Sequence, residues 1–575
     1  MSKLSPRDIK KHLSDASLFV ERGQLQDAES ALKKILYDFP SHPNALSNLA
    51  TICFMQNKIE EAINYTKKSL EINPYQAVAL NNCALGLRTL GRLDEALHMS
   101  EESIRIQLNN IDAYITSSLI LSEMEKYTES LFYLNKALEI QNQTSHNNEI
   151  LATIYNNRGN VFLKQEKFNI ALGDIEQALK LRPNFVEALQ NKALILKNLG
   201  NYDEALKILD EVIEFGTKML GETYHIKGMI YERLSKPDLA INFFTLAIET
   251  NPQIYEARTA LGYCQLRIKN FIEGWENYEF RIFQKDHALN KKNLDINSWF
   301  NINKQDSLLI LKEQGIGDHI FFAGFLNELK KRSNFITVEL DKRLINLFER
   351  SFENINFVEK ILQNEFDDFY KVIPLGSIAK FFRRSLDDFR NTEYKYLKVD
   401  ELRANEIKKN IKFKNSLKIG ISWRSQGKST GDIRTLNFEQ FIKIFESKNI
   451  SIINLQYGNI ENDIALIDGS ENYEFINYHE IDNYKDIDGL ACLIEICDIV
   501  ITVDNITAHL AGALGKKTWI LLPTYSDFRW MEKTSECVWY KNVRLFRQES
   551  MGNWDFVTSN IKKMLEDFIN NEFLQ

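Results

Sequence analysis

The sequence predicts an α plus α/β protein, in which an all-α helical solenoid is followed by two α/β lobes. Small residues recur about every 34 positions through the first half of the 575-residue chain. After about residue 305, strand-like apolar runs alternate with helical patterns. All seven tryptophans lie at or after Trp275, so the two halves also differ in composition. A chain of this length should hold about three domains.

The period of the first half is carried by small residues. Counting 34 residues at a time gives eight units, once seven extra residues after Ser130 and one after Ala205 are allowed for. The marker residues are Ala28, Ala62, Ala96, Ser130, Ala171, Ala205, Ala240 and Gly274. Small side chains let paired helices approach closely, and a proline twelve residues after four of the markers ends the second helix. This helix–turn–helix period is typical of tetratricopeptide repeats, and the phrases GRLDEAL and GNYDEAL resemble that family closely.

The repeats are predicted to span residues 1–288 and to stack into a superhelix with a concave face. We interpret this face as a groove for a peptide or protein partner; the alternative is a solenoid that packs only on the second half or on itself. Asparagines of the first helices could hold a peptide backbone or could be ordinary solvated surface, and they are Asn48, Asn81, Asn82, Asn156, Asn157 and Asn191. The stretch 141–150, QNQTSHNNEI, is predicted to be a polar loop.

The eighth unit is bulkier than the others and reads FIEGWENYEFRI over residues 271–282. Because a terminal repeat must cap the array or meet the next domain, we predict that this unit is the joint. Residues 289–304 are rich in lysine and asparagine and are predicted to be a linker.

The second half reads as two Rossmann-like lobes, over residues 305–402 and 403–575. Alternating strand and helix patterns predict parallel sheets with helices on both faces, and a cleft between the lobes that binds ligands at the carboxyl ends of the strands. A final helix is expected at 555–573. The expected strands are 307–312, 335–340, 368–375, 417–423, 450–457, 473–478, 498–504 and 517–523.

Charge and composition disfavour several classes of protein. The net charge of −8 argues against non-specific binding of nucleic acid, since a surface that tracks phosphates is usually basic. The N-terminus lacks the apolar stretch of a signal peptide, and no apolar run approaches the roughly 20 residues that span a bilayer. The six cysteines are scattered without the pairing of a metal site. We expect a reduced, cytoplasmic protein.

A polar turn follows the apolar run 499–503. Asp504, Asn505 and His509 lie in this turn or in the first turn of the helical stretch 506–514. Free N–H groups and the positive dipole end make a helix N-terminus an anion site that suits a diphosphate, to which His509 could donate. The alternative is that Asp504 only caps the helix and His509 is a half-buried histidine with its hydrogen bonds satisfied.

A second turn, EQGIGD, follows the first strand of the first lobe. Gly315 and Gly317 let the backbone come close to a substrate. Ile320 stands where the dinucleotide fingerprint needs a third glycine, although Glu339 ends the second strand as a ribose-binding acid would. The incomplete fingerprint disfavours a nicotinamide or flavin enzyme.

Several phrases together resemble one enzyme family. DNITAHLAGALG, DFRW, VWY and RLFRQ resemble the C-terminal lobe of bacterial glycosyltransferases related to the lipopolysaccharide heptosyltransferases. EQGIGD and GISWRSQGKSTGDIRTL are similar to the family's opening turn and inter-lobe segment, and repeats joined to such a domain are similar in layout to O-linked N-acetylglucosamine transferases. The resemblance covers nearly the whole chain. It implies the GT-B fold, a nucleotide-sugar as donor substrate, inversion at the anomeric centre, and neither a metal nor another cofactor.

By position, the resemblance implies roles for single residues. Asp318 would be the general base that takes the proton of the acceptor hydroxyl, or would only cap a helix. Arg434, helped by Lys428, would meet the donor phosphates and stabilise the leaving nucleoside diphosphate, or would belong to a solvated basic loop. Gln456 would touch the base or ribose, and Trp423 is expected to contact the substrate.

The sequence therefore predicts an inverting glycosyltransferase that moves a sugar to a hydroxyl of an acceptor. The acceptor would be a protein docked on the repeats, with bacterial flagellin or another surface protein as a candidate. One alternative is a catalytically inactive repeat scaffold for protein–protein interaction, and another is a transferase acting on a glycan or lipid-linked acceptor. Asn505 stands where the family commonly has threonine, so a hydroxyl contact is lost there.

Overall fold

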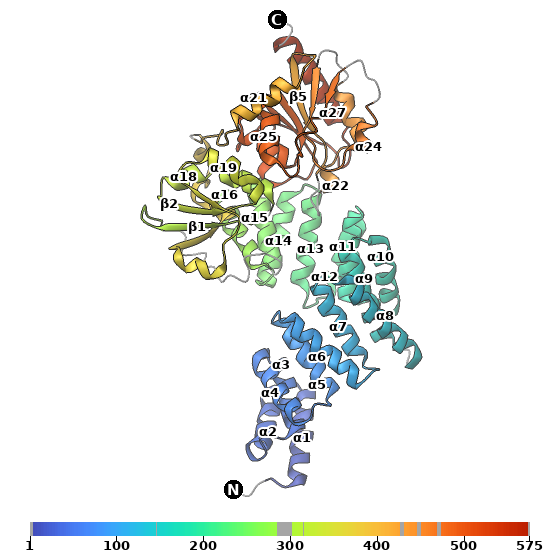
Figure 1. The fold of residues 1–575 in the computed structure, drawn as a ribbon. Coiled ribbons are helices and arrows are strands. Elements are labelled where there is room, and N and C mark those ends of the chain that lie inside the picture. The colour runs from blue at the N-terminus through green and yellow to red at the C-terminus, as the bar shows by residue number, and fades with distance from the viewer. Residues whose placement is uncertain are drawn as a thin grey trace. The chain divides into compact units, whose positions relative to one another are not determined.

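The structure is a computed structural model, and it describes residues 4–144, 147–284, 302–313, 315–390, 392–425, 431–445, 450–467 and 473–572. The chain forms two compact units, Met1–Met219 and Leu220–Gln575 (Figure 1). Lys428 and almost all of the predicted linker 289–304 lie outside the described residues.

The first unit is an array of helices that pair in sequence. The helices are α1 (Pro6–Glu21), α2 (Leu25–Asp38), α3 (Pro43–Met55), α4 (Ile59–Ile72), α5 (Ala77–Thr89), α6 (Leu93–Ile106), α7 (Ile111–Glu123), α8 (Tyr127–Thr144), α9 (Asn148–Lys164), α10 (Phe168–Leu181), α11 (Val186–Asn198) and α12 (Tyr202–Glu214). The small markers of this unit, such as Ala62 and Ala171, are fully buried where the helices of a pair meet. The predicted helical repeats are confirmed.

Each helix pair turns through one left-handed residue at the same position of the repeat. The backbone angle φ lies between 52° and 82° at Gly23, Asn57, Gly91, Glu125, Glu166, Gly200, Ser235 and Lys269. Glycine adopts this conformation without strain, whereas other residues lose roughly 1–2 kcal/mol through the clash of Cβ with the backbone. This turn recurs at the period that the small residues predict.

The predicted polar loop at 141–150 is wrong. Helix α8 continues to Thr144 and α9 begins at Asn148, so most of the extra residues lengthen two helices. The side chain of Asn147 caps α9 by accepting hydrogen bonds from the N–H groups of Glu149 and Ile150, at 2.9 and 3.4 Å. The polar residues of this stretch are therefore mostly exposed ends of two helices, and not a loop.

The second unit begins with the last two repeats. They consist of α13 (Leu220–Arg233), α14 (Pro237–Thr250), α15 (Tyr255–Arg267), α16 (Phe271–Tyr278) and the 3-10 turn η1 (Glu279–Phe283). These repeats belong to the same compact unit as the sheets that follow.

A four-stranded parallel sheet follows, with the order β3-β2-β1-β4. Its strands are β1 (Ser307–Leu311), β2 (Phe335–Glu339), β3 (Asn356–Val358) and β4 (Lys371–Pro374). Its main helices are α17 (Ile316–Ala323), α18 (Leu326–Lys330), α19 (Ile345–Ser351) and α20 (Ala379–Phe382). The three-residue strand β3 was not predicted from the sequence.

A six-stranded parallel sheet completes the unit, with the order β10-β9-β8-β5-β6-β7. Its strands are β5 (Leu417–Ser422), β6 (Ile450–Asn454), β7 (Glu474–Ile476), β8 (Ile499–Val503), β9 (Thr518–Leu522) and β10 (Val543–Arg547). Its helices are α21 (Glu401–Asn410), α22 (Gly431–Arg434), α23 (Phe438–Ile442), α24 (Glu461–Ile464), α25 (Ile487–Ile496), α26 (Ile506–Ala513) and α27 (Asp555–Glu572). The sequence predicts the parallel sheets of an α + α/β chain, and the structure contains them. The predicted boundary between the lobes, at 402/403, falls inside α21.

One apolar core joins the last repeat to both sheets. Trp275 and Tyr278 share it with Phe321 of α17, Leu510 of α26 and Trp539. Helix α25 covers this face of the six-stranded sheet, and α27 packs in a second core on the other face (Figure 1). The eighth repeat is therefore the joint that its bulky sequence predicts.

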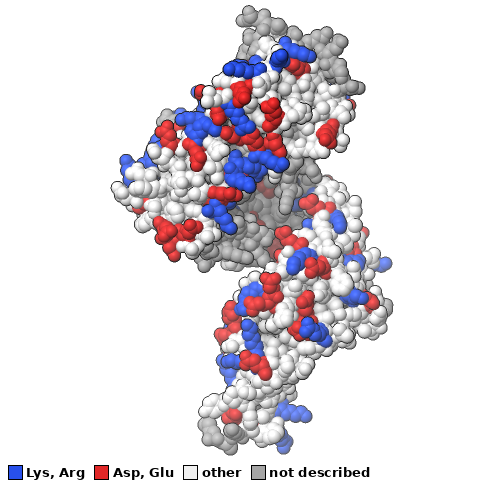
Figure 2. Space-filling model, viewed as in Figure 1, with Lys and Arg blue, Asp and Glu red and all other residues white. Residues whose placement is uncertain are grey.

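On the face shown in Figure 2, lysine and arginine side chains are interspersed with aspartate and glutamate over both units. Within the part of the chain that the structure describes, no helix is both long and apolar enough to cross a membrane.

Candidate functional site

Charged and polar side chains gather where α17 and α26 pack together, at the carboxyl ends of β1 and β8. In open parallel sheets this is the edge where ligands bind. A Cβ added at Gly317 would lie 3.3 Å from the ring of His509. Glycine at this position therefore permits the close approach of the two helices.

Asp318 lies in the first turn of α17. Its Oδ2 accepts a hydrogen bond from the N–H of Gly315 at 2.9 Å, and its Oδ1 pairs with Arg529. Burial raises the pKa of the Asp318 carboxyl, and Arg529 opposes that rise. The side chain remains 21% exposed, so one carboxylate serves as a helix cap and still faces the site.

Arg529 is the centre of the charge cluster. It lies in the short turn η9 (Phe528–Trp530), and its Nη1 donates to Asp527 at 2.8 Å while Nη2 pairs with Asp318. Its guanidinium packs over the ring of Phe321, 4.8 Å from the ring centroid. The sequence assigned no role to Arg529, although the phrase DFRW contains it.

Asp504 and Arg434 form a second ion pair. Nη1 of Arg434 lies 3.2 Å from Oδ2 of Asp504, which is 3% exposed. Burial raises the pKa of the Asp504 carboxyl, and Arg434 lowers it in part. The guanidinium predicted to meet phosphates is therefore already compensated by a neighbouring carboxylate.

Asn505, rather than Asp504, caps α26. Its Oδ1 accepts from the N–H groups of Thr507 and Ala508, at 2.9 and 3.4 Å. Its Nδ2 donates to the hydroxyl of Ser422 at 2.7 Å and to the carbonyl of Arg424 at 3.0 Å. The predicted alternative that Asp504 is the cap is wrong, and Asn505 also ties the end of β5 to the start of α26.

His509 is buried against aromatic rings. It stacks on Trp530 with ring centroids 5.1 Å apart, and Nδ1 lies 3.1 Å from the hydroxyl of Tyr540. Burial, together with Arg529, lowers the pKa of His509 to about 3. The ring is neutral at pH 7, and in the tautomer that accepts the Tyr540 proton at Nδ1 it carries its own hydrogen on Nε2.

Gln456 and Trp423 contribute to the frame under the site. The Oε1 of Gln456 accepts from the Ser422 hydroxyl at 3.0 Å and from the N–H groups of Trp423 and Arg424 at 2.8 Å. The ring of Trp423 is fully buried and packs on Phe438, with centroids 4.5 Å apart. These contacts place both side chains in structural roles, and their predicted contact with substrate stays a prediction.

A polar cavity of about 460 Å³ lies at the carboxyl ends of β6 and β7. In its wall, Asn454 donates to Asn477 at 2.9 Å, and Asn483 donates to the carbonyl of Gln456 at 3.1 Å. The buried Oδ1 of Asn483 has no hydrogen-bond partner among the described residues. Amides beside the ring of Tyr484 offer both the hydrogen bonds and the apolar face that a heterocyclic base requires.

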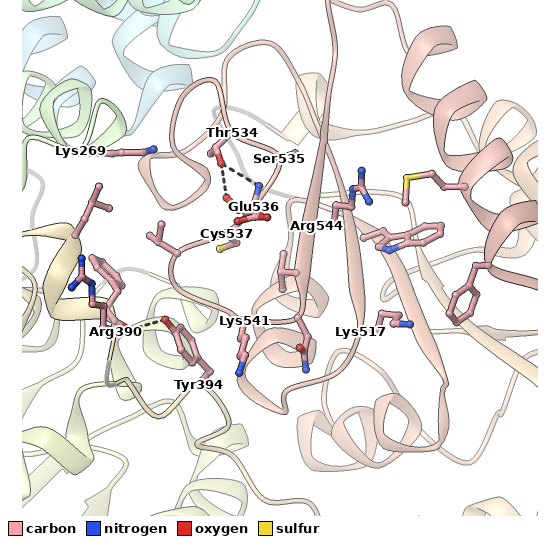
Figure 3. Close-up of a pocket in the computed structure, with 18 of the residues that line it drawn as sticks. Lys269, Arg390, Tyr394, Lys517, Thr534, Ser535, Glu536, Cys537, Lys541 and Arg544 are labelled. Carbon is pink, nitrogen blue, oxygen red and sulfur yellow. Dashed lines mark hydrogen bonds between the residues drawn. The ribbon is translucent and has the colours of Figure 1, made fainter. Parts of the chain in front are cut away.

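A larger cavity, of about 1010 Å³, lies beside the edge strand β10 (Figure 3). Lys269, Arg390, Lys541 and Arg544 lie around it, and it contains none of the predicted site residues. These four side chains are exposed to solvent, whereas the ion pairs of Arg529 with Asp318 and of Arg434 with Asp504 are at least partly buried. The buried charge cluster is therefore the better candidate for chemistry than the larger cavity.

The fold brings together most of the predicted site residues that it describes. Gly317 meets the ring of His509 across α17 and α26, and Asp318 accepts from the N–H of Gly315 in the same turn. Asp527, Arg529, Trp530 and Tyr540 were not predicted as site residues. The phrases DFRW and VWY contain them, but only the folded chain shows that they lie beside Asp318 and His509.

Comparisons with protein-family models support the repeats. Two models, each described as "Tetratricopeptide repeat", match residues 111–184 and 43–76. The model "Psidin, N-terminal TPR repeats region" matches residues 148–276.

Among known proteins, the chain is similar to protein FlbA of Caulobacter vibrioides, with 24% identity over 78% of this chain and 71% of that protein. It is also similar to the Hsp70-Hsp90 organising protein of Plasmodium falciparum, with 33% identity over 16% of each chain. Among solved structures, a tetratricopeptide repeat protein from Parabacteroides merdae covers 44% of this chain and 98% of its own, with 18% identity and a TM-score of 0.39. The family matches and the helix pairs together identify the N-terminal part of this chain as an array of tetratricopeptide repeats.

Proposed function

We propose that the chain is an inverting glycosyltransferase of the GT-B fold, with a nucleotide-sugar donor and a protein hydroxyl as acceptor. The observation that carries the proposal is the charge cluster at the carboxyl ends of two parallel sheets, in which Asp318 pairs with Arg529, and Arg529 and His509 both pack against Phe321. The resemblance of these same segments to heptosyltransferase-like enzymes supports the assignment.

Asp318 acts as the general base in this proposal. The acceptor hydroxyl loses its proton to the carboxylate, its oxygen forms the bond to the anomeric carbon, and the bond from that carbon to the phosphate oxygen breaks. The nucleoside diphosphate leaves with the electron pair. The exposure of the carboxylate and its pairing with Arg529 fit a base that is held in place and still reachable.

The leaving diphosphate is stabilised by Arg434, His509 and the start of α26. Arg434 shares its charge between Asp504 and the phosphate, and the Nε2 hydrogen of neutral His509 donates to a phosphate oxygen. The hydroxyl of Thr507, in the first turn of α26, is buried without a hydrogen-bond partner among the described residues. A ligand oxygen would satisfy it. The polar cavity beside Gln456 would hold the nucleoside.

The repeats hold the acceptor protein. Asparagines recur on first helices of the repeats, and Asn191 donates to Asn156 at 2.9 Å while Asn82 donates to the hydroxyl of Thr51 at 3.5 Å. These contacts link neighbouring repeats along one side of the array. Their remaining amide groups suit the backbone of an extended peptide.

A second candidate function is a scaffold without transferase activity. It is favoured by one observation: Arg434 and Arg529 are each already neutralised by carboxylates, as in a site that no longer binds phosphate. In this case the repeats would bind a partner and no sugar would be transferred.

Thermal unfolding with a panel of nucleoside diphosphates separates the two functions. Binding stabilises the folded state, by about 2.7 kcal/mol at a ligand concentration of 100 times Kd. For the transferase we expect a shift in Tm with one nucleotide, which His509→Ala and Arg434→Ala remove and which Arg158→Ala, in the first unit, preserves. The absence of a shift with every nucleotide would instead support the scaffold.

A further inference from the structure

Two buried arginines of the last repeat form ion pairs with the segments that carry Asp318 and Arg529. Arg267 ends α15 and Arg281 lies in η1, and each side chain is 2% exposed. Burying a guanidinium is costly unless it is paired and hydrogen-bonded. Both arginines find their main partners outside the repeats but within the same compact unit.

Arg281 pairs with Glu313 directly after β1. Its Nε donates to Glu313 at 2.9 Å and its Nη2 at 2.6 Å, in the two-pronged geometry that fixes orientation. The same Nη2 donates to the hydroxyl of Ser377 at 2.9 Å, and Glu313 accepts from the N–H of Gly376. The pair therefore ties the repeat to the turns after β1 and after β4.

The ion pair of Arg281 and Glu313 is closely packed against the backbone of Gly376. A Cβ at Gly376 would lie 2.6 Å from Oε1 of Glu313 and 2.8 Å from Nη2 of Arg281. Glu313 lies at the start of the EQGIGD turn, whose end is Asp318. Fixing Glu313 therefore fixes the base of the turn that presents the proposed catalytic carboxylate.

Arg267 holds the other side of the cluster. It pairs with Glu532, and the N–H of Glu532 donates to the carbonyl of Arg267 at 2.9 Å. The ring of Tyr525 lies under Arg267 and Arg233, 4.9 and 5.0 Å from their guanidinium carbons. Tyr525 and Glu532 bracket the segment that carries Arg529.

Both members of the Asp318–Arg529 pair are thus held from one short region at the end of the repeats. We propose that Arg281 and Arg267 are positioning residues that keep Asp318 and Arg529 in register, so that the last repeat forms part of the working site. The expected fall in kcat rests on the proposed transferase function. The expected loss of backbone order around Asp318 does not, because it can be measured without any activity.

The experiment uses variants of the full chain. Arg281→Gln removes the anchor but leaves Glu313 buried without its partner, which can unfold the protein. The double variant Arg281→Met/Glu313→Gln removes both charges and keeps an oxygen for the N–H of Gly376. Arg281→Lys keeps the charge without the two-pronged contact. The control is Arg158→Gln, because Arg158 makes a similar paired contact with Asp174 inside the first unit, at 2.7 Å for each nitrogen.

Hydrogen exchange of the backbone amides gives the first readout. We expect the amides of residues 315–323 to exchange about tenfold faster in the double variant than in the wild type, since a local opening is no longer opposed by the anchor. The control variant should leave them unchanged. If the amides of residues 315–323 exchange in the double variant at the same rate as in the wild type, the proposal is overturned.

The kinetic readout separates positioning from binding. We expect kcat to fall about 10- to 100-fold in the double variant, with the KM for the donor nearly unchanged and partial recovery in Arg281→Lys. A fall no larger than in Arg158→Gln would overturn the positioning role. If the wild type transfers no sugar from any donor, the proposed function fails, and the exchange measurement still decides this inference.

Discussion

Asp318 divides its carboxylate between two partners. Oδ2 accepts from the N–H of Gly315 and caps α17, whereas Oδ1 pairs with Arg529. The helix-cap role that the sequence allowed is confirmed, and the role as a general base stays a prediction. Both oxygens have a partner, and a base role for Asp318 would therefore use a remaining lone pair of the carboxylate.

Replacing this carboxylate tests the base directly. Asp318→Asn can still accept from Gly315 but cannot take a proton, so we expect kcat to fall about 100- to 10,000-fold while nucleoside diphosphate binding persists. Asp387→Asn is the matched control, because Asp387 is 74% exposed and pairs only with Arg390 in the described contacts. Steady-state kinetics measure the effect, and an Asp318→Asn protein with the wild-type rate would remove Asp318 from the base role.

His509 should make the stability of the protein depend on pH. Its folded pKa of about 3 lies below the ordinary histidine value of 6.5, so the unfolded chain binds more protons between these pH values. The contribution is complete above pH 6.5 and declines as the pH falls, by at most about 1.4 kcal/mol per unit.

His509→Gln removes this dependence, and urea unfolding at several pH values should show a shallower loss of stability below pH 6.5 than in the wild type. Above pH 7 the difference in free energy of unfolding between the two proteins should be constant. Parallel curves down to pH 4 would show that His509 is not buried in the neutral form.

At the scale of elements, the continuous apolar strands were predictable, whereas the edge strands β3 and β10 were not. β8 and β9 are buried on both faces, so their sequences are uninterrupted apolar runs. β10 lies at the edge of the sheet and carries the exposed Arg544, which interrupts the pattern.

The same reasoning explains which site residues the sequence revealed. Asp504, Asn505 and His509 follow a strand that the sequence marks clearly, so their place at a sheet edge was predictable. Arg529 and Tyr540 follow β9 without a periodic pattern of their own. Only the packing of α17 on α26 shows that they face Asp318 and His509.

The left-handed turns of the repeats offer a test of element stability. Glu166 has φ of 60°, so Glu166→Gly should raise the free energy of unfolding of the first unit by about 1 kcal/mol through relief of strain. Gly200 has φ of 82° and open space around its Cβ position, so Gly200→Ala should lower it by a similar amount through strain alone. Denaturant unfolding measures both, and Asn57→Gly should change least because asparagine tolerates this conformation. Equal effects of all three would contradict the strain.

At the scale of the whole molecule, the compact units do not follow the repeat boundary. The sequence predicts a repeat domain over 1–288, but the last two repeats share a compact unit with both sheets. Sequence periodicity could not reveal this division, because a repeat has the same pattern wherever it packs. The apolar core around Trp275 and Tyr278 is what joins them.

Fragments test this division. We expect residues 220–575 to fold alone with a cooperative thermal transition and to retain nucleoside diphosphate binding. A fragment 289–575 lacks Trp275 and Arg281, which exposes the core and leaves Glu313 without its ion-pair partner. We expect it to aggregate or to melt without a cooperative transition. A stable, cooperative 289–575 fragment would contradict the shared core.

The shared core also limits how the protein could be retargeted. Exchanging repeat arrays between related chains is the direct way to change the proposed acceptor, and sequence periodicity alone places the junction where the last repeat ends. A graft at that point would replace Trp275, Arg267 and Arg281 along with the docking surface. A graft between α12 and α13, where the compact units divide, would exchange the repeats of the first unit and leave the proposed reaction centre its own two repeats.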